Sequence, residues 1–274
     1  MTTHPSQRAS DQPAAAPPSP CFDPELEDAI RADAIDIVFQ PQIEPIGGRV
    51  IGAEALARWD KCASADELFH RAAEARLAER LSRSVQRKAI RMAARWQGPL
   101  KRLRLSINAL PADLNRAKYE QWLLGVIAAE KLDPARLTLE IVETALVIDR
   151  PAVAERLQTL RDQGIGIAVD DFGTGYANLA YLTSLPLDSL KIDQALVADL
   201  VGGSREKIVV KAMIGMASDL GLSVTVEGVE TAAQLQLLAA WGCDCYQGFL
   251  GAGAMNEAEL ARFVAIANAA PIAA

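Results

Sequence analysis

The sequence predicts an α/β barrel of the (β/α)8 type, formed by a single domain of about 250 residues. Two observations support this fold class. Eight short β-like runs alternate with amphipathic helical segments between residues 35 and 247, a pattern typical of parallel α/β structure. Polar side chains also stand in or at the ends of seven consecutive runs. In a closed barrel the carboxyl ends of the strands converge on one face, so these side chains are expected to meet there.

The two ends of the 274-residue chain differ in composition from the rest. Residues 1–21 are rich in Pro, Ala and Ser, so we expect a disordered leader. We assign residues 22–268 to the barrel and expect residues 269–274 to fray. No linker-like segment or short internal repeat divides the middle of the chain, which favours one folded domain.

The eight predicted strands are short runs rich in Val, Ile and Leu, separated by helical segments and turn residues. They cover residues 35–39, 50–56, 103–108, 137–142, 166–171, 189–192, 223–227 and 244–247.

Amphipathic segments between the strands carry helix start and stop signals. One helix is predicted between Pro151, which fits a first helical turn, and Gly164, which fits a C-terminal cap. Another is predicted between Ser204 and Gly221. The expected core-facing side chains are Val153, Leu157 and Leu160 in the first and Ile208, Ala212, Met216 and Leu220 in the second. An earlier helix shows the same spacing with Leu81, Val85, Ala89, Met92 and Trp96.

Composition excludes several classes of protein. Half of the residues are hydrophobic and 23% are charged, so a large core is available. The net charge of −7 argues against a DNA or RNA partner, because nucleic-acid surfaces need clustered Lys and Arg. No apolar run is long enough to span a membrane, and no secretory signal pattern is present. The four cysteines are too few for a disulfide scaffold, and Cys243 and Cys245 are expected to be buried thiols rather than zinc ligands. We therefore expect a cytoplasmic protein.

The polar residues at the strand ends are mostly acidic. They are Glu54, Asn108, Glu140, Glu143, Asp170, Asp171, Lys191, Glu227 and Gln247. If five of these carboxylates converge (Glu54, Glu140, Asp170, Asp171 and Glu227), they would repel one another and resist burial, and Lys191 supplies only one positive charge. Oxygen ligands without histidine favour Mg²⁺ or Mn²⁺ over Zn²⁺, since His4 and His70 lie outside these motifs. The Asp170–Asp171 doublet could serve two ions roughly 3.5–4 Å apart, a common arrangement for phosphodiester hydrolysis.

These motifs resemble those of the EAL-domain family of cyclic di-GMP phosphodiesterases. The matching segments are FQP at 39–41, EALARW at 54–59, LSIN at 105–108, LEIVET at 139–144, DDFGTGY at 170–176, LPLDSLKID at 185–193, VEGVET at 226–231 and QGF at 247–249. The resemblance implies a barrel whose first strand is antiparallel to the rest. It also implies hydrolysis of one phosphodiester bond of cyclic di-GMP, which yields linear pGpG, and a homodimer formed near the loop after the fifth strand.

The resemblance assigns roles to individual side chains. The implied metal ligands are Glu54, Asn108, Glu140, Asp170, Asp171 and Glu227. Lys191 matches the lysine that orients or activates water, and Glu227 is also a candidate general base; with Glu54 they form the implied catalytic set. The implied substrate contacts are Gln40, Leu56, Arg58 and Gln247. Glu143, which would steady the loop 172–179, and Glu230 are implied supporting residues.

Two segments depart clearly from the family pattern, and a third, YANL at 176–179 where YSSL is common, differs mildly. Residues 60–69 replace a longer loop, and residues 251–255 replace an aromatic, Ser- and Pro-containing segment that we expect to border the ligand cleft. None of these changes removes an implied ligand. An alternative hypothesis is a cyclic di-GMP receptor or protein-interaction module without useful turnover, and residues 251–255 are its main support. The complete ligand set favours the enzyme.

Overall fold

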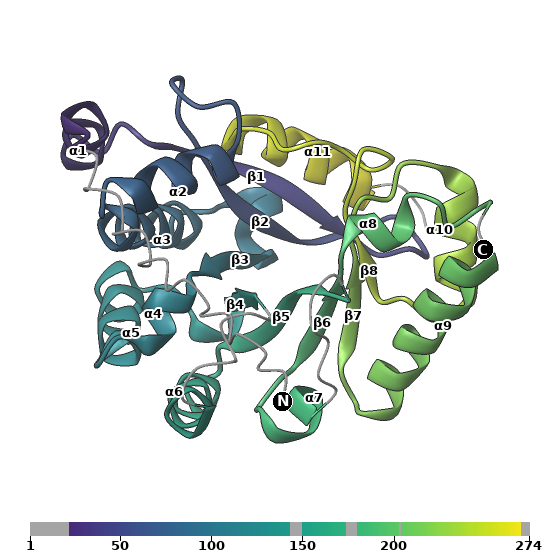
Figure 1. The fold of residues 1–274 in the computed structure, drawn as a ribbon. Helices are drawn as coiled ribbons and strands as arrows, with labels where there is room; N and C mark the ends of the chain where they lie inside the picture. Colours follow the sequence, from purple (N-terminus) through teal and green to yellow (C-terminus); the bar gives the residue numbers. More distant parts are fainter. Residues whose placement is uncertain (1–21, 143–149, 174–179, 203, 270–274) are drawn as a thin grey trace, which may run out of the picture.

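The strands close into a barrel with helices packed around its outside (Figure 1). The computed structural model describes residues 22–142, 150–173, 180–202 and 204–269. In these ranges the strands are β1 (Asp36–Ile43), β2 (Val50–Arg58), β3 (Arg104–Ala109), β4 (Leu137–Val142), β5 (Gly166–Phe172), β6 (Ser189–Ile192), β7 (Ser223–Val226) and β8 (Cys245–Tyr246). β1 is antiparallel to β2 and β8, and all other neighbours are parallel. The predicted fold class and the antiparallel first strand are confirmed.

The helices cover the outer face of the barrel and follow the strands in chain order (Figure 1). They are α1 (Pro24–Arg31), α2 (Ala65–Glu74), α3 (Ala78–Ala94), α4 (Pro111–Asn115), α5 (Tyr119–Glu130), α6 (Arg150–Asp162), α7 (Ala180–Ser184), α8 (Gln194–Val197), α9 (Ser204–Asp219), α10 (Ala232–Ala240) and α11 (Glu257–Ala269), with 3₁₀ turns η1 (Gly98–Arg102) and η2 (Pro134–Arg136). None of the helices within the described ranges combines the length and the apolar character that a membrane span requires.

The hydrophobic core lies between the barrel and the surrounding helices. Side chains alternate along each strand, so Leu139 and Ile141 of β4 are fully buried against the helices while Glu140 points inward. The predicted face of α6 is confirmed, because Val153 and Leu157 are completely buried. The same alternation on the other strands turns one set of side chains towards the barrel axis, where the site lies.

The predicted core stripe of α9 is wrong. Its members, Ile208, Ala212, Met216 and Leu220, are exposed or only half-buried. The buried residues of this helix are Val210, Met213, Ile214 and Ala217, which have the same helical spacing on another face. Because α9 is apolar on two faces, periodicity alone does not determine which one packs on the barrel.

Strand β1 continues through Pro41 to Ile43, beyond its predicted end at Phe39. Proline lacks an amide hydrogen, so strands usually stop there. Phe39 exchanges backbone hydrogen bonds of 2.7 and 2.9 Å with Met255 on the side away from β2. Two residues later, the nitrogen of Pro41 therefore faces that same side and interrupts no β1–β2 hydrogen bond. The extra length brings Gln42 into the barrel.

Candidate active site

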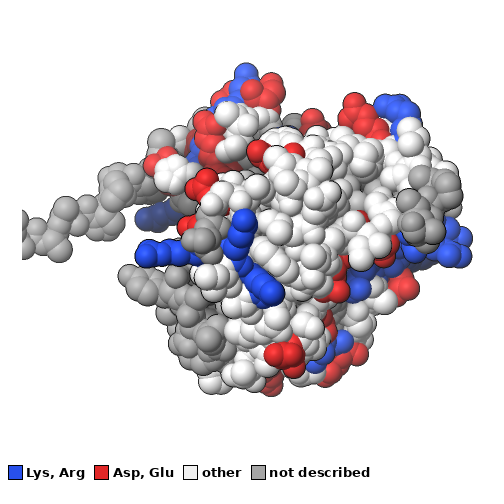
Figure 2. Space-filling model, turned by 90° about the vertical axis from the view of Figure 1, so that its right-hand side faces the viewer, with Lys and Arg blue, Asp and Glu red and all other residues white. Residues whose placement is uncertain are grey.

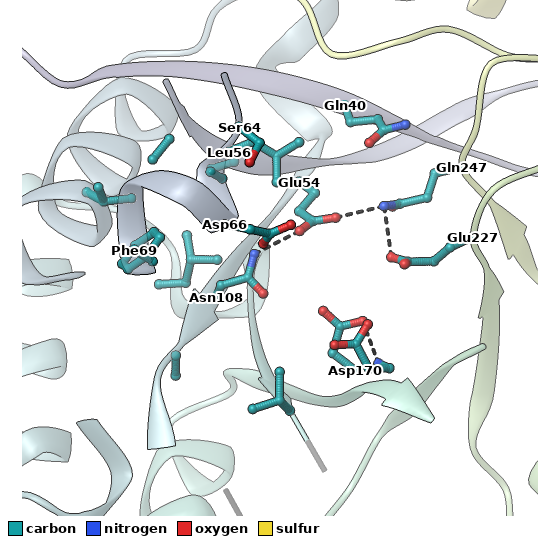
Figure 3. Close-up of a pocket in the computed structure, with 18 of the residues that line it drawn as sticks. Gln40, Glu54, Leu56, Ser64, Asp66, Phe69, Asn108, Asp170, Glu227 and Gln247 are labelled. Carbon is teal, nitrogen blue, oxygen red and sulfur yellow. Dashed lines mark hydrogen bonds between the residues drawn. The ribbon is translucent and has the colours of Figure 1, made fainter. Parts of the chain in front are cut away.

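A pocket of about 510 Å³ opens at the carboxyl ends of the barrel strands (Figure 3). Many of the side chains predicted for the site line it: Gln40, Glu54, Leu56, Arg58, Asn108, Asp170, Asp171, Glu227, Glu230 and Gln247. Glu140 and Lys191 lie at its base, in contact with these residues. Glu143 and most of the loop 172–179 lie outside the described residues.

Lys191 lies at the centre of an acidic cluster. Its Nζ is 2.7 Å from Glu140 Oε2 and 2.7 Å from Glu227 Oε1. The same atom is 3.1 Å from Asp170 Oδ1 and 3.3 Å from Glu54 Oε2. The Lys191 side chain is only 2% exposed. One buried ammonium group therefore contacts carboxylates from β2, β4 and β5 and a fourth, Glu227, that directly follows β7.

Burial and mutual repulsion disturb the protonation of this cluster. Burial acts to lower the pKa of the Lys191 ammonium, but the surrounding carboxylates, Glu140 foremost, hold it well above its usual value. Burial, followed by repulsion from Glu54, raises the pKa of Glu140 well above its usual value. Burial also raises the pKa of Glu227 to about 7 and that of Asp171 to about 6. Glu54 differs: burial raises its pKa, but Lys191 and two amide donors outweigh burial and lower it.

Three amide side chains orient the carboxylates. Gln247 Nε2 donates to Glu54 Oε2 at 2.7 Å and to Glu227 Oε1 at 3.1 Å, and Asn108 Nδ2 donates to Glu54 Oε1 at 2.8 Å (Figure 3). Among the described residues, the side-chain oxygen of Asn108 makes no hydrogen bond and is available to a cation. Gln42 Nε2 reaches Glu140 Oε1 at 3.5 Å. Gln42 is not predicted from the sequence because Pro41 signals the end of a strand, although alternation from Gln40 indicates an inward-facing residue at position 42.

A local distortion brings both residues of the aspartate doublet to the pocket. Successive strand residues normally face opposite ways, and Asp170 follows this rule. Asp171 has a φ of 56° in the left-handed region, which Asp tolerates better than most residues. The β5–β6 register shifts between Val169 and Phe172. The chain thus turns at the end of β5, and both carboxylates line the pocket.

The donor groups fit divalent cations. Glu54, Glu140 and Asp170 offer carboxylate oxygens within 4.8 Å of one another, and so do Asp170, Asp171 and Glu227. Asp170 is common to the two groups, so the ions of two adjacent sites could share it. Five carboxylates face a single ammonium, which leaves a large deficit of positive charge. Oxygen ligands of this kind suit Mg²⁺ or Mn²⁺.

The two segments that depart from the family pattern have different positions. Ser64, Asp66 and Phe69 line the pocket, so the shortened segment and α2 form part of its wall (Figure 3). Residues 251–255, which were expected to border the cleft, are not among its lining residues, although the nearby Phe249 is. Met255 instead pairs with Phe39 and helps to close the seam between β8 and β1, which are joined only at Ile43 and Tyr246.

Cys245 in β8 and Cys243, two residues before it, are buried, as predicted. Burial raises the pKa of both Cys243 and Cys245 to about 12. Cys243 Sγ donates to the carbonyl oxygen of Cys245 at 2.8 Å. Among the described residues neither belongs to a cluster of metal-ligating side chains.

Without metal, the protein is expected to lose stability as the pH rises from about 4.5 to about 7. Glu140, Asp171 and Glu227 have raised pKa values, so the folded chain holds their protons more tightly than the unfolded chain. Their stabilising contribution is complete below their ordinary pKa values and is lost as pH rises through the folded-state values. For Glu227, whose pKa rises from 4.5 to about 7, the change is up to about 3 kcal/mol.

Urea denaturation between pH 4.5 and 8 in the presence of a chelator measures this effect. The Glu227→Gln variant, which cannot ionise at that position, should show a flatter dependence. A free energy of unfolding that increases over this range would contradict the prediction.

Comparison with known proteins gives the same family as the motifs. A family model described as EAL domain matches residues 23–254. Cyclic di-GMP phosphodiesterase PA2567 of Pseudomonas aeruginosa is 38% identical over 232 residues, which cover 83% of this chain and 40% of that protein. Cyclic di-GMP phosphodiesterase NbdA of the same organism is 34% identical, with 88% of this chain and 31% of that protein covered. This chain therefore spans less than half the length of these two relatives.

Solved structures of related chains have the same fold. The PaMucR phosphodiesterase, in complex with c-di-GMP, superposes with a TM-score of 0.79 at 30% identity, covering 86% of this chain and 99% of that one. The EAL domain of DcpA from Mycobacterium smegmatis gives a TM-score of 0.73 at 32% identity, covering 84% and 96%. The family match over most of the chain, the barrel and the acidic pocket agree: this chain belongs to the EAL domain family.

Proposed function

We propose that this protein is a metal-dependent phosphodiesterase that hydrolyses cyclic di-GMP to linear pGpG. The acidic cluster around Lys191 is the observation that carries the proposal, since it joins a site for divalent cations to a pocket of ligand size. Two relatives are named cyclic di-GMP phosphodiesterases, and a solved relative is a c-di-GMP complex.

The proposed cation ligands are the oxygens of Glu54, Asn108, Glu140, Asp170, Asp171 and Glu227. When bound, two Mg²⁺ or Mn²⁺ ions would polarise the phosphate oxygens and lower the pKa of the attacking water. Asn108 and Gln247 hold the Glu54 carboxylate in one orientation by hydrogen bonds to its two oxygens. Arg58, at the rim, can donate a fork of hydrogen bonds to a phosphate.

Lys191 and Glu227 carry the proton chemistry in this proposal. The Lys191 ammonium is held in place by four carboxylates and presents a fixed positive charge beside the attacking water. Glu227, whose pKa burial raises to about 7 in the metal-free protein, is the proposed general base for that water. The water oxygen attacks phosphorus, the bond from phosphorus to the ribose 3′ oxygen breaks, and that oxygen takes up a proton. The product keeps a 5′ phosphate.

Other pocket residues have proposed binding roles. Leu56 and Gln40 line the pocket and would contact the substrate (Figure 3). Gln247 donates to Glu227, and Glu230 also lines the pocket. Glu143 remains a proposed supporting residue for the loop 172–179.

A turnover assay of the purified chain with cyclic di-GMP and Mg²⁺ or Mn²⁺ tests the proposal, with products separated by chromatography. Linear pGpG that forms only with metal and disappears with chelator is the expected result. Saturable binding of cyclic di-GMP without product would instead establish a receptor. If the protein neither binds nor hydrolyses cyclic di-GMP, the enzyme and receptor hypotheses are both refuted. A protein-interaction module is then the remaining hypothesis.

We also propose a homodimer in which α9 contributes to the contact. Ile208, Val209 and Leu220 are 70%, 45% and 42% exposed, and the face of the molecule on the α9 side is largely uncharged at its centre (Figure 2). Light scattering after size-exclusion chromatography is expected to give twice the monomer mass, and Ile208→Glu should shift the protein to monomer. A monomeric wild-type protein at every concentration, with ligand and metal present, would contradict the proposal.

A further inference from the structure

One carboxylate of the pocket stands apart from the acidic cluster. Asp66 lies in the first turn of α2, and its side chain points from the helix towards the interior of the pocket (Figure 3). It belongs to neither of the two groups of oxygens that suit a cation. Among the described residues, no hydrogen bond or ion pair occupies its carboxylate, and the residue is exposed to the pocket solvent. Asp66 is thus an uncommitted acceptor.

An uncommitted carboxylate conflicts with the charge of the proposed substrate. Cyclic di-GMP carries two phosphates, so a negative side chain away from the cations repels it unless the ligand offers hydrogen-bond donors at that point. Guanine does so: N1–H and the N2 amino group lie side by side on its Watson–Crick edge. A carboxylate can accept from both at once, whereas adenine presents an acceptor at N1 and a single amino donor.

The wall beside Asp66 suits a flat base. Leu56 of β2, Phe69 of α2 and Val85 of α3 line the same pocket as Asp66. Phe69 and Val85 are half-buried, so parts of both side chains remain open to a ligand. Aromatic and aliphatic faces bind bases by stacking but do not distinguish one base from another. Discrimination at this end therefore has to come from a polar group such as Asp66.

We propose that Asp66 determines specificity for guanine by accepting hydrogen bonds from N1–H and N2–H of one base of the substrate. This inference rests on the proposed function and adds a residue that selects the base. It assigns a role to α2, the helix that begins within the shortened segment 60–69.

The test compares Asp66→Asn with a matched control, Asp60→Asn. Asp60 is also exposed and lies six residues earlier in the chain, but it does not line the pocket. For the full chain with Mg²⁺ or Mn²⁺, we would measure kcat and KM for cyclic di-GMP and the inhibition constant of cyclic di-AMP. An asparagine amide can donate to adenine N1 and accept from its amino group, so the variant should tolerate adenine better.

For Asp66→Asn, we expect KM for cyclic di-GMP to rise about tenfold and selectivity over cyclic di-AMP to fall by at least about tenfold. The Asp60→Asn variant should match the wild type, and circular dichroism melting should show that both variants fold. Unchanged selectivity in Asp66→Asn, or an equal change in the control, would overturn the inference while leaving the phosphodiesterase proposal intact. A wild-type chain that neither binds nor hydrolyses cyclic di-GMP would overturn both.

Discussion

Lys191→Met is expected to abolish turnover and, in the absence of metal, to destabilise the folded chain by about 3–5 kcal/mol at pH 8. Lys191 contacts four carboxylates and is almost completely buried. Methionine keeps most of the side-chain volume but leaves the acidic cluster without an internal cation, and breaking a buried ion pair in this way leaves uncompensated charge. Turnover is lost because the fixed charge beside the attacking water is removed.

The pH and metal dependence of the Lys191→Met variant distinguish this cause from a packing defect. Carboxylates without a cation can avoid repulsion by binding protons, so the variant should recover stability as the pH is lowered towards 5. Added Mg²⁺ or Mn²⁺ should also restore stability, because the ions replace the missing charge. Urea denaturation with and without chelator measures both effects.

Lys101→Met is a suitable control, since Lys101 is exposed on η1 and its replacement should leave the free energy of unfolding unchanged. Equal stability of the wild type and Lys191→Met at pH 8 in chelator would show that the ammonium does not stabilise the cluster.

Glu54→Gln is expected to lower kcat/KM by about 10²–10⁴-fold. The Glu54 carboxylate accepts hydrogen bonds from Asn108 and Gln247 and contacts Lys191. Glutamine has the same size, but its terminal NH₂ group replaces one of the two carboxylate oxygens. That NH₂ group would face the amide donor of Asn108 or of Gln247, and one hydrogen bond would be lost. It also removes one of the three carboxylates in the group formed by Glu54, Glu140 and Asp170.

Calorimetric titration with Mn²⁺ separates the two consequences of Glu54→Gln. One of two binding events should weaken or disappear, since a neutral amide oxygen is a poorer ligand than a carboxylate. Glu74→Gln removes a charge from the exposed end of α2 and provides the control. Full turnover and unchanged Mn²⁺ binding in Glu54→Gln would exclude Glu54 from both roles.

Most of the residues that line the pocket could be predicted because they lie in or directly after a strand. Glu54, Glu140 and Lys191 occupy strands whose neighbouring residues are strongly apolar, so alternation assigns them to the inner face. Gln42 was not predicted because Pro41 signals a strand end. The strand continues because Pro41 has its nitrogen on the side of β1 that faces Met255, where it interrupts no hydrogen bond to β2. The role of Asp66 likewise depends on where α2 packs, which local patterns do not specify.

By itself, the sequence determined the fold class, the order of the strands and the acidic, histidine-free character of the site, because local periodicity and short motifs encode these features. Only the tertiary structure decided which groups touch. Lys191 and Glu54 are 137 positions apart, and Gln247 and Glu54 are 193 apart, yet closure of the barrel joins them. Closure likewise decided which apolar face of α9 is buried, since both faces have helical spacing and only contact with the barrel favours one of them.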